Sequence, residues 1–158
     1  MEQVNALEIL REAMHLEKEG MRFYTKAAKC ASNPRARQVF KRLAQDELGH
    51  LEKLELVYDN LVETSEWLVM QDLADSSKGG QADVDVFEQG LGDEGLDEFG
   101  AIETGIRAEK ESIEFYKRSR DECGGGDHRG KELFNWLISF EKQHLSLLQD
   151  LKKEYADS

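Results

Sequence analysis

The sequence predicts an all-α fold: four long helices packed as a bundle, with a long crossover between the second and the third. Three observations predict it. Helix-favouring Leu, Glu, Lys, Arg and Ala dominate the composition, and proline occurs once in 158 residues. Apolar residues recur at steps of three and four along four long segments. The second pair of segments repeats the polar residues of the first, which indicates two related hairpins in one domain, residues 1–158.

The first helix is predicted over about 3–30, where the apolar stripe includes Leu10, Met21 and Tyr24. Glu17 stands in the middle of that stripe. A carboxylate buried at such a position is strongly destabilising unless it is paired or bound to a metal ion. Glu17 is therefore a candidate metal ligand.

The second helix is predicted over about 34–62, and Pro34 suits its first turn. Its apolar stripe encloses Glu47 and His50, which are three residues apart. Side chains at that spacing project from one side of a helix, so both can reach the same ion. The pair adds two candidate ligands.

The helical period breaks down over about 65–98. Ser65 is predicted to cap a short helix that contains Trp67 and Leu73. A connection of this length inside a domain usually has a function or crosses the fold. A crossover along the bundle makes the second and third helices run parallel.

The third helix is predicted over about 96–123, with Glu109 inside its apolar stripe. A loop with three consecutive glycines follows. The fourth helix is predicted over about 131–155, and its stripe encloses Glu141 and His144 at the spacing of the second helix. These three residues complete a set of six candidate ligands.

The internal repeat aligns residue by residue. With an offset of 92, the run EKEGMRFY from Glu17 matches EKESIEFY from Glu109. With an offset of 94, the matched residues are Phe40, Leu43, Glu47, His50 and Leu51 with Phe134, Leu137, Glu141, His144 and Leu145. Two such hairpins imply a pseudo-twofold bundle that brings the polar residues to one shared centre.

Two other histidines are excluded from the set. Glu12 and His15 also have the three-residue spacing. At about 100° per residue, however, His15 lies roughly 160° and Glu12 roughly 140° around the helix from Glu17, so both residues should face solvent. His128 lies in the glycine-rich loop and is expected to be exposed.

The competing interpretation of the six candidates is a buried polar network without metal. Such a network needs cations, and the four core-facing stripes contain no Lys or Arg. Carboxylates and imidazoles suit iron or manganese, whereas structural zinc sites favour thiolates.

Tyr24 and Tyr116 lie two turns beyond Glu17 and Glu109 on the same helix faces. They are either hydrogen-bond donors to the ligands or ordinary core residues.

Composition excludes several classes of function. The formal net charge of −12 argues against nucleic-acid binding, which requires a basic face. No apolar run approaches the roughly 20 residues that span a membrane, and the acidic N-terminus lacks a signal-peptide pattern, so we expect a cytoplasmic protein. The two cysteines, Cys30 and Cys123, form neither a disulfide framework nor a CxxC metal motif.

The ligand order E, ExxH, E, ExxH, with an FY pair after each lone Glu, resembles the rubrerythrin branch of the ferritin-like superfamily. The resemblance covers nearly the whole chain outside about 65–98. It implies a ferritin-like four-helix bundle that holds two iron ions, with manganese or zinc as substitutes. The implied roles are terminal carboxylates for Glu17 and Glu109, bridging carboxylates for Glu47 and Glu141, and one imidazole for each iron from His50 and His144.

The resemblance also implies an activity and partners. A di-ferrous centre of this family reacts with hydrogen peroxide or dioxygen, and a homodimer is expected. This chain has no cysteine pairs of a rubredoxin domain, so its electrons would come from a separate donor such as a rubredoxin. Ser112 stands where rubrerythrins tend to have an additional Glu that is linked to peroxidase behaviour.

Three functions follow as hypotheses. The first is a non-haem di-iron oxidoreductase that reduces peroxide or dioxygen and protects against oxidants. The second is a ferroxidase or iron-handling protein, in which iron is the substrate, and the acidic composition is compatible with it. The third is a non-catalytic metal-binding bundle.

Overall fold

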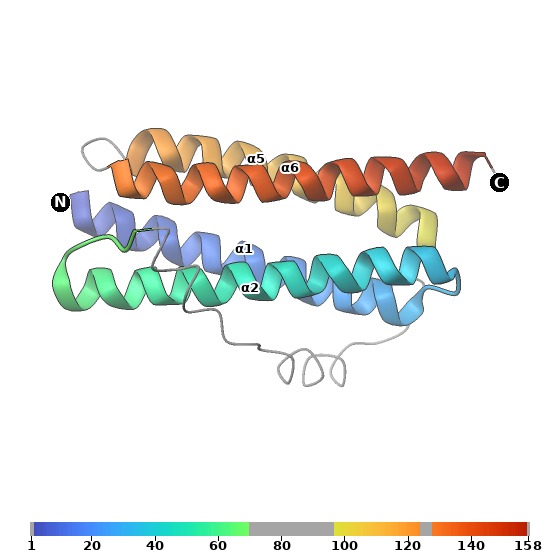
Figure 1. Cartoon of the computed structure of the whole chain (residues 1–158), viewed down its shortest axis with the longest axis horizontal. Helices are drawn as coiled ribbons and strands as arrows, with labels where there is room; N and C mark the ends of the chain where they lie inside the picture. The colour runs from blue at the N-terminus through green and yellow to red at the C-terminus, as the bar shows by residue number, and fades with distance from the viewer. Residues whose placement is uncertain (1, 70–96, 124–127, 158) are drawn as a thin grey trace.

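The computed structural model describes residues 2–69, 97–123 and 128–157. Four long helices lie along one another as two hairpins (Figure 1). They are α1 (Glu2–Cys30), α2 (Pro34–Thr64), α5 (Glu98–Cys123) and α6 (His128–Ala156). The main packing is α1 on α2 and α5 on α6. The prediction of an all-α four-helix bundle is confirmed.

The hairpins are joined so that α2 and α5 run in the same direction (Figure 1). The end of α2 and the start of α5 therefore lie at opposite ends of the bundle, as a crossover requires. Most of the predicted crossover lies outside the described residues. No described helix is long and apolar enough to cross a membrane.

The turn between α1 and α2 has a clear cause in the sequence. Asn33 caps α2, because its side-chain oxygen accepts hydrogen bonds from the backbone N–H of Arg35 at 2.9 Å and of Ala36 at 3.1 Å. Pro34 follows in the first turn, where it lacks only an N–H that has no helical partner.

Two predicted boundaries are wrong. Ser65 ends α2 instead of starting a short helix: it has φ 62° and ψ 19°, and its N–H donates to the Leu61 carbonyl. Residues 66–69 form no helix. The fourth helix begins at His128 and not at Lys131, so residues 128–130, which the sequence predicts as loop, belong to α6.

Trp67 anchors the chain after α2. Its side chain is 8% exposed and packs edge-on against Phe134, with ring centroids 6.4 Å apart. Arg129 donates a hydrogen bond to the Trp67 carbonyl, and a Cβ added at Gly130 would lie 3.2 Å from the Trp67 ring. The absence of a side chain at Gly130 thus lets the indole lie close against the start of α6.

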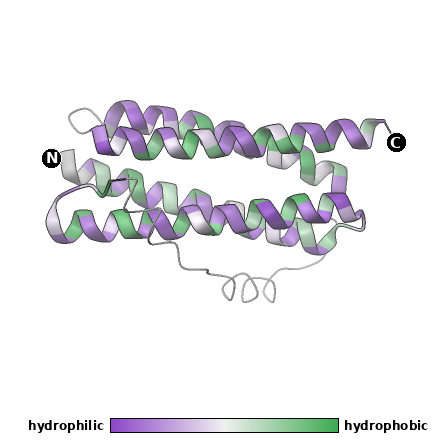
Figure 2. Cartoon of the chain, in the orientation of Figure 1, coloured by the Kyte–Doolittle hydropathy of each residue, from purple (hydrophilic) through white to green (hydrophobic). Residues whose placement is uncertain are grey.

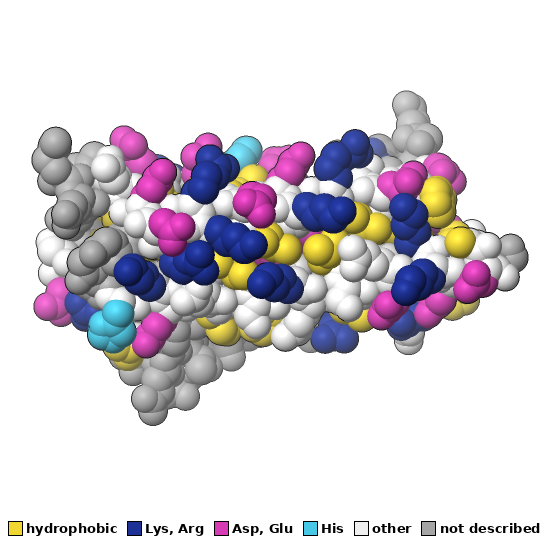
Figure 3. Space-filling view, turned by 90° about the horizontal axis from the view of Figure 1, so that it is seen from above, with side chains coloured by type: hydrophobic (Ala, Val, Ile, Leu, Met, Phe, Trp, Pro, Cys, Tyr) yellow, Lys and Arg dark blue, Asp and Glu magenta, His cyan; other side chains and the backbone are white. Residues whose placement is uncertain are grey.

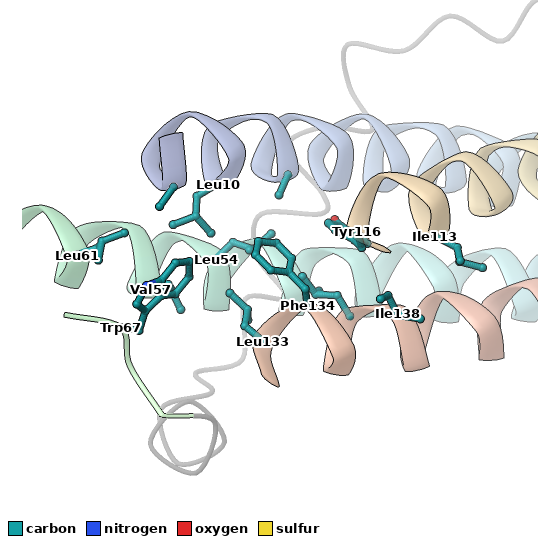
Figure 4. Close-up of a cluster of buried hydrophobic side chains, with 13 residues drawn as sticks. Leu10, Leu54, Val57, Leu61, Trp67, Ile113, Tyr116, Leu133, Phe134 and Ile138 are labelled. Carbon is teal, nitrogen blue, oxygen red and sulfur yellow. The ribbon is translucent and has the colours of Figure 1, made fainter. Parts of the chain in front are cut away.

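The core consists of two apolar clusters that fill opposite ends of the bundle. The first, shown in Figure 4, includes Leu10, Leu54, Val57, Tyr116, Leu133 and Phe134. The second includes Tyr24, Ala27, Phe40, Leu43, Ile102 and Leu148. Along every helix the residues of the two clusters flank a short polar interval. Hydrophilic and apolar residues alternate along all four helices (Figure 2). Charged side chains of both signs are spread over the face shown in Figure 3, with apolar side chains visible between them.

Candidate metal centre

The polar interval between the two clusters contains the six residues that the sequence singles out. All are buried, with exposed fractions of 1–4%: Glu17, Glu47, His50, Glu109, Glu141 and His144. Each helix contributes the residues predicted for it, because each occupies the core-facing stripe at the same height. The structure therefore brings all six candidates into one layer.

The six side chains form two overlapping groups. Within each group, one potential ligand atom per residue lies within 4.8 Å of the others. One group contains Glu17, Glu47, His50 and Glu141, and the other contains Glu47, Glu109, Glu141 and His144. Glu47 and Glu141 belong to both groups, while each group has its own glutamate and histidine. This arrangement could hold two metal ions, with two carboxylates shared between them.

Both imidazoles direct Nδ1 into the centre. His50 Nδ1 lies 3.5 Å from Glu17 Oε2 and 3.4 Å from Glu141 Oε1. His144 Nδ1 lies 3.0 Å from Glu47 Oε1 and 3.5 Å from Glu109 Oε1. The two rings stack with centroids 5.8 Å apart and planes inclined by 18°.

The centre fits divalent cations. Among the described residues, each of the six has at least one buried polar atom without a hydrogen bond of acceptable geometry: Glu17 Oε2, Glu47 Oε1, His50 Nδ1, Glu109 Oε2, Glu141 Oε1 and His144 Nδ1. Buried polar atoms normally have a partner. No Lys or Arg is buried in the part of the chain that the structure describes. Four carboxylates would balance the charge of two divalent ions, and this donor set suits iron or manganese.

The electrostatics describe a centre that retains protons when no cation is bound. Burial raises the pKa of Glu47 and of Glu109, and the Glu141 carboxylate adds to both increases. Burial by itself lowers the pKa of His50, but Glu17 and Glu141 outweigh it and raise that pKa to about 9. Metal ions must displace these protons, so metal affinity should fall as the pH decreases.

Two buried tyrosines hold the carboxylates that are not shared. Tyr24 on α1 donates a hydrogen bond to Glu109 Oε1 on α5 at 2.7 Å. Tyr116 on α5 donates to Glu17 Oε1 on α1 at 2.6 Å. Each tyrosine thus contacts the glutamate of the other hairpin. Burial raises the pKa of both hydroxyls, so they remain protonated donors.

Asp46 is a functional candidate that the sequence analysis missed. Its Oδ2 lies 3.0 Å from His144 Nε2, on the side of the imidazole that faces away from the centre. A carboxylate at this position orients a ligating histidine and raises its basicity. The available signal was a carboxylate immediately before Glu47, but the partner lies on another helix.

The excluded residues lie where the sequence predicts. Glu12 and His15 are exposed on the outer face of α1. The His128 side chain is 80% exposed at the start of α6. None of the three takes part in either group of potential ligands.

A cavity of about 870 Å³ opens between α1 and α5 and reaches the centre at Glu47, Glu109 and Glu141. Its walls include the pseudo-equivalent pair Phe23 and Phe115. Gly20 and Ser112, which the repeat also pairs, line it too. A Cβ added at Gly20 would lie 3.2 Å from Glu47 Oε2. The small residues leave this side of the centre accessible.

The comparisons with known proteins agree with this geometry. A two-domain protein from Anabaena variabilis, with DJ-1/ThiJ/PfpI-like and ferritin-like domains, resembles the structure with a TM-score of 0.74. The likeness covers 99% of this chain but 41% of that protein, and at 14% identity it shows the fold alone. No curated protein sequence matches the chain. The rubrerythrin family model matches residues 8–152, which include most of all four helices. The chain therefore belongs to the rubrerythrin family.

Proposed function

We propose that the protein is a non-haem di-iron oxidoreductase that reacts with hydrogen peroxide or dioxygen and protects against oxidants. The observation that supports it most is the pair of ligand groups that share Glu47 and Glu141. Two ferrous ions at this centre would supply the two electrons that, with two protons, reduce one hydrogen peroxide to two waters. A separate electron donor such as a rubredoxin, and a homodimer, are parts of the proposal.

The protein contributes positioning and access. The Tyr24 and Tyr116 hydroxyls fix the orientation of Glu109 and Glu17, which reduces the reorganisation that metal binding requires. The two apolar clusters exclude water from both ends of the centre. The α1–α5 cavity leaves one side through which a small oxidant can approach.

Ser112 contributes to the accessibility of that side. It lines the cavity at the position where the family tends to have a second glutamate on this helix. A serine hydroxyl is too short to act as the missing carboxylate, so the space remains open to solvent molecules or substrate. The open space favours a reaction with an external small molecule over a purely structural metal site.

The charge around the cavity favours a second candidate, a ferroxidase. Its lining outside the centre includes four glutamates, Glu12, Glu19, Glu111 and Glu114, against the two cations Lys110 and Arg118. A net negative opening attracts cations and raises their local concentration. Ferrous iron would then be the substrate, with dioxygen as its oxidant.

One experiment separates these functions. The metal-free protein is loaded anaerobically with ferrous iron, the bound iron is counted, and oxidation is followed by stopped-flow absorption with peroxide or dioxygen. The proposal predicts two retained ions for each chain and faster oxidation by peroxide than by dioxygen. Fast dioxygen consumption with further iron uptake would instead support a ferroxidase. Failure to bind iron stably would contradict both.

A further inference from the structure

The two histidines of the centre differ on the side of the ring that faces outward. His144 Nε2 has the Asp46 carboxylate 3.0 Å away. His50 Nε2 is fully buried and has no hydrogen-bond partner among the described residues. The two imidazoles are otherwise equivalent, because each directs Nδ1 toward carboxylates of the centre and each is at most 2% exposed.

The internal repeat explains the difference. With the same offset of 94 that relates the ligands, Asp46 on α2 corresponds to Phe140 on α6, and Arg42 corresponds to Trp136. Arg42 Nε lies 3.9 Å from Asp46 Oδ2. The centroids of the Phe140 and Trp136 rings are 4.9 Å apart. Both rings meet the His50 ring edge-on, with centroid distances of 4.9 Å for Phe140 and 5.2 Å for Trp136. A charged pair supports one histidine, and an aromatic pair encloses the other.

The difference between the charged pair beside His144 and the aromatic pair beside His50 has a direct consequence for metal binding. When Nδ1 ligates a metal ion, the remaining proton of a neutral imidazole is on Nε2. A carboxylate that accepts a hydrogen bond from this N–H orients the ring and strengthens the ligand, and its loss typically weakens metal affinity about 10–100-fold. The N–H of His50 would be buried against aromatic rings, without the acceptor that compensates for desolvation.

We propose that Asp46 makes the two metal positions unequal. The position formed by Glu109 and His144 binds a divalent metal ion about 10–100-fold more tightly than the position formed by Glu17 and His50. A chain that holds a single ion therefore holds it beside His144, and the ion beside His50 is the exchangeable one. This inference rests on the proposed metal centre and adds a positioning residue to it.

The test measures each position separately, because two adjacent cations also repel each other. Co²⁺ is titrated into the metal-free protein, and binding is followed by calorimetry and visible absorption. His50→Ala leaves the His144 position, and His144→Ala leaves the His50 position. We expect the dissociation constant of the second variant to exceed that of the first about 10–100-fold.

Asp46→Ala supplies the matched control. In the His50→Ala background it should weaken Co²⁺ binding about tenfold or more. In the His144→Ala background it should change nothing, because Asp46 then has no imidazole to support. Conversely, Phe140→Asp in the His144→Ala background should tighten binding by giving His50 an acceptor.

A second measurement uses the unaltered protein and does not depend on the folding of any variant. With one equivalent of Mn²⁺, electron paramagnetic resonance should show isolated ions in a single environment, because the position beside His144 fills first. Equal dissociation constants in the two single-histidine variants, two equally populated environments in the half-loaded sample, or equal weakening by Asp46→Ala in both backgrounds would overturn the inference. Two equal positions would leave the proposed function intact, whereas no metal binding at all would overturn both.

Discussion

The first hairpin, α1–α2, and the second, α5–α6, contribute the same ligands: one lone glutamate and one Glu/His pair each. Their surroundings differ at the positions next to those ligands. Gly20 corresponds to Ser112, and Asp46 corresponds to Phe140. The repeated residues form the centre, and the residues that differ give its two halves unequal surroundings.

The hairpins also depend on each other. Tyr24 and Tyr116 each donate to a glutamate of the opposite hairpin, and Glu47 and Glu141 belong to both ligand groups. Neither hairpin therefore contains a complete metal position. The following predictions test which residues act for both halves and which for one.

The largest effect is expected for the shared carboxylates. Glu47→Gln or Glu141→Gln should reduce the iron content from two ions to fewer than one for each chain, because both positions lose a ligand. Glu17→Gln should leave about one ion, because Glu17 belongs to one group. Metal analysis after gel filtration measures this. Equal losses for Glu17→Gln and Glu47→Gln would mean that Glu47 is not shared.

Removing either tyrosine hydroxyl should weaken metal affinity by the same factor, whereas Asp46 and Phe140, which also correspond in the repeat, differ in their effect on it. Tyr24→Phe and Tyr116→Phe each remove one hydrogen bond to a buried glutamate, at 2.7 Å and 2.6 Å. Each change should weaken the affinity for one of the two ions about tenfold. Co²⁺ titration of the two variants provides the comparison. A loss of thermal stability without any change in affinity would make them ordinary core residues.

Substitutions to alanine at Gly20 and Ser112 should differ in the size of their effect on the oxidation rate. Gly20→Ala adds a Cβ that lies 3.2 Å from Glu47 Oε2, so we expect oxidation by peroxide to slow by roughly 3–10-fold as the carboxylate shifts by a few tenths of an ångström. The same change should raise stability by less than about 1 kcal/mol, because the helix preference of alanine is partly offset by the close contact with Glu47.

Ser112→Ala is the control for Gly20→Ala, because it adds no carbon to the cavity wall. Its oxidation rate should stay close to that of the unaltered protein. Stopped-flow absorption and thermal unfolding of both variants measure the two effects independently. An unchanged oxidation rate in Gly20→Ala would show that Glu47 accommodates the methyl group without loss.

The smallest effect is expected at Glu98, which joins the hairpins away from the metal centre. Its carboxylate accepts hydrogen bonds from the Tyr155 hydroxyl, from Ser32 and from the Asn33 N–H. The Tyr155 bond, with those from Ser32 and Asn33, lowers the pKa of Glu98 to about 2 despite some burial. Glu98→Gln should cost about 1 kcal/mol at pH 7, because the site is partly exposed.

The pH dependence of this cost has a definite sign. The folded-state pKa of Glu98 lies below its usual value, so the stabilisation is fully present above about pH 4.5 and is lost as the pH falls toward 2. The difference in unfolding free energy between Glu98→Gln and the unaltered protein should decrease over that interval. Denaturant unfolding at several pH values measures it, and a constant difference would contradict the assignment.

The local pattern predicts much of the fold. The helical period places Glu17, Glu47 and Glu109 on core-facing stripes, and it places His15 on the opposite side. The period is a property of each helix alone, so it is visible before the helices pack. The helical period does not locate the helix ends at Ser65 and His128. The first end depends on Ser65 itself, which is in the left-handed region, and the second follows a glycine-rich stretch of sequence.

Four amphipathic helices, each with a polar interruption, are evident in the sequence alone, and the internal repeat indicates that the interruptions meet. The family resemblance already implies that Glu47 and Glu141 are shared, and their membership of both ligand groups agrees with it. Two features became visible only when the helices were packed together: each tyrosine bonds to the glutamate of the opposite hairpin, and Asp46 reaches His144. Periodicity specifies the face of a helix and nothing more. Contacts between residues 85–99 positions apart depend on the axial offset and rotation of one helix against another, which packing establishes.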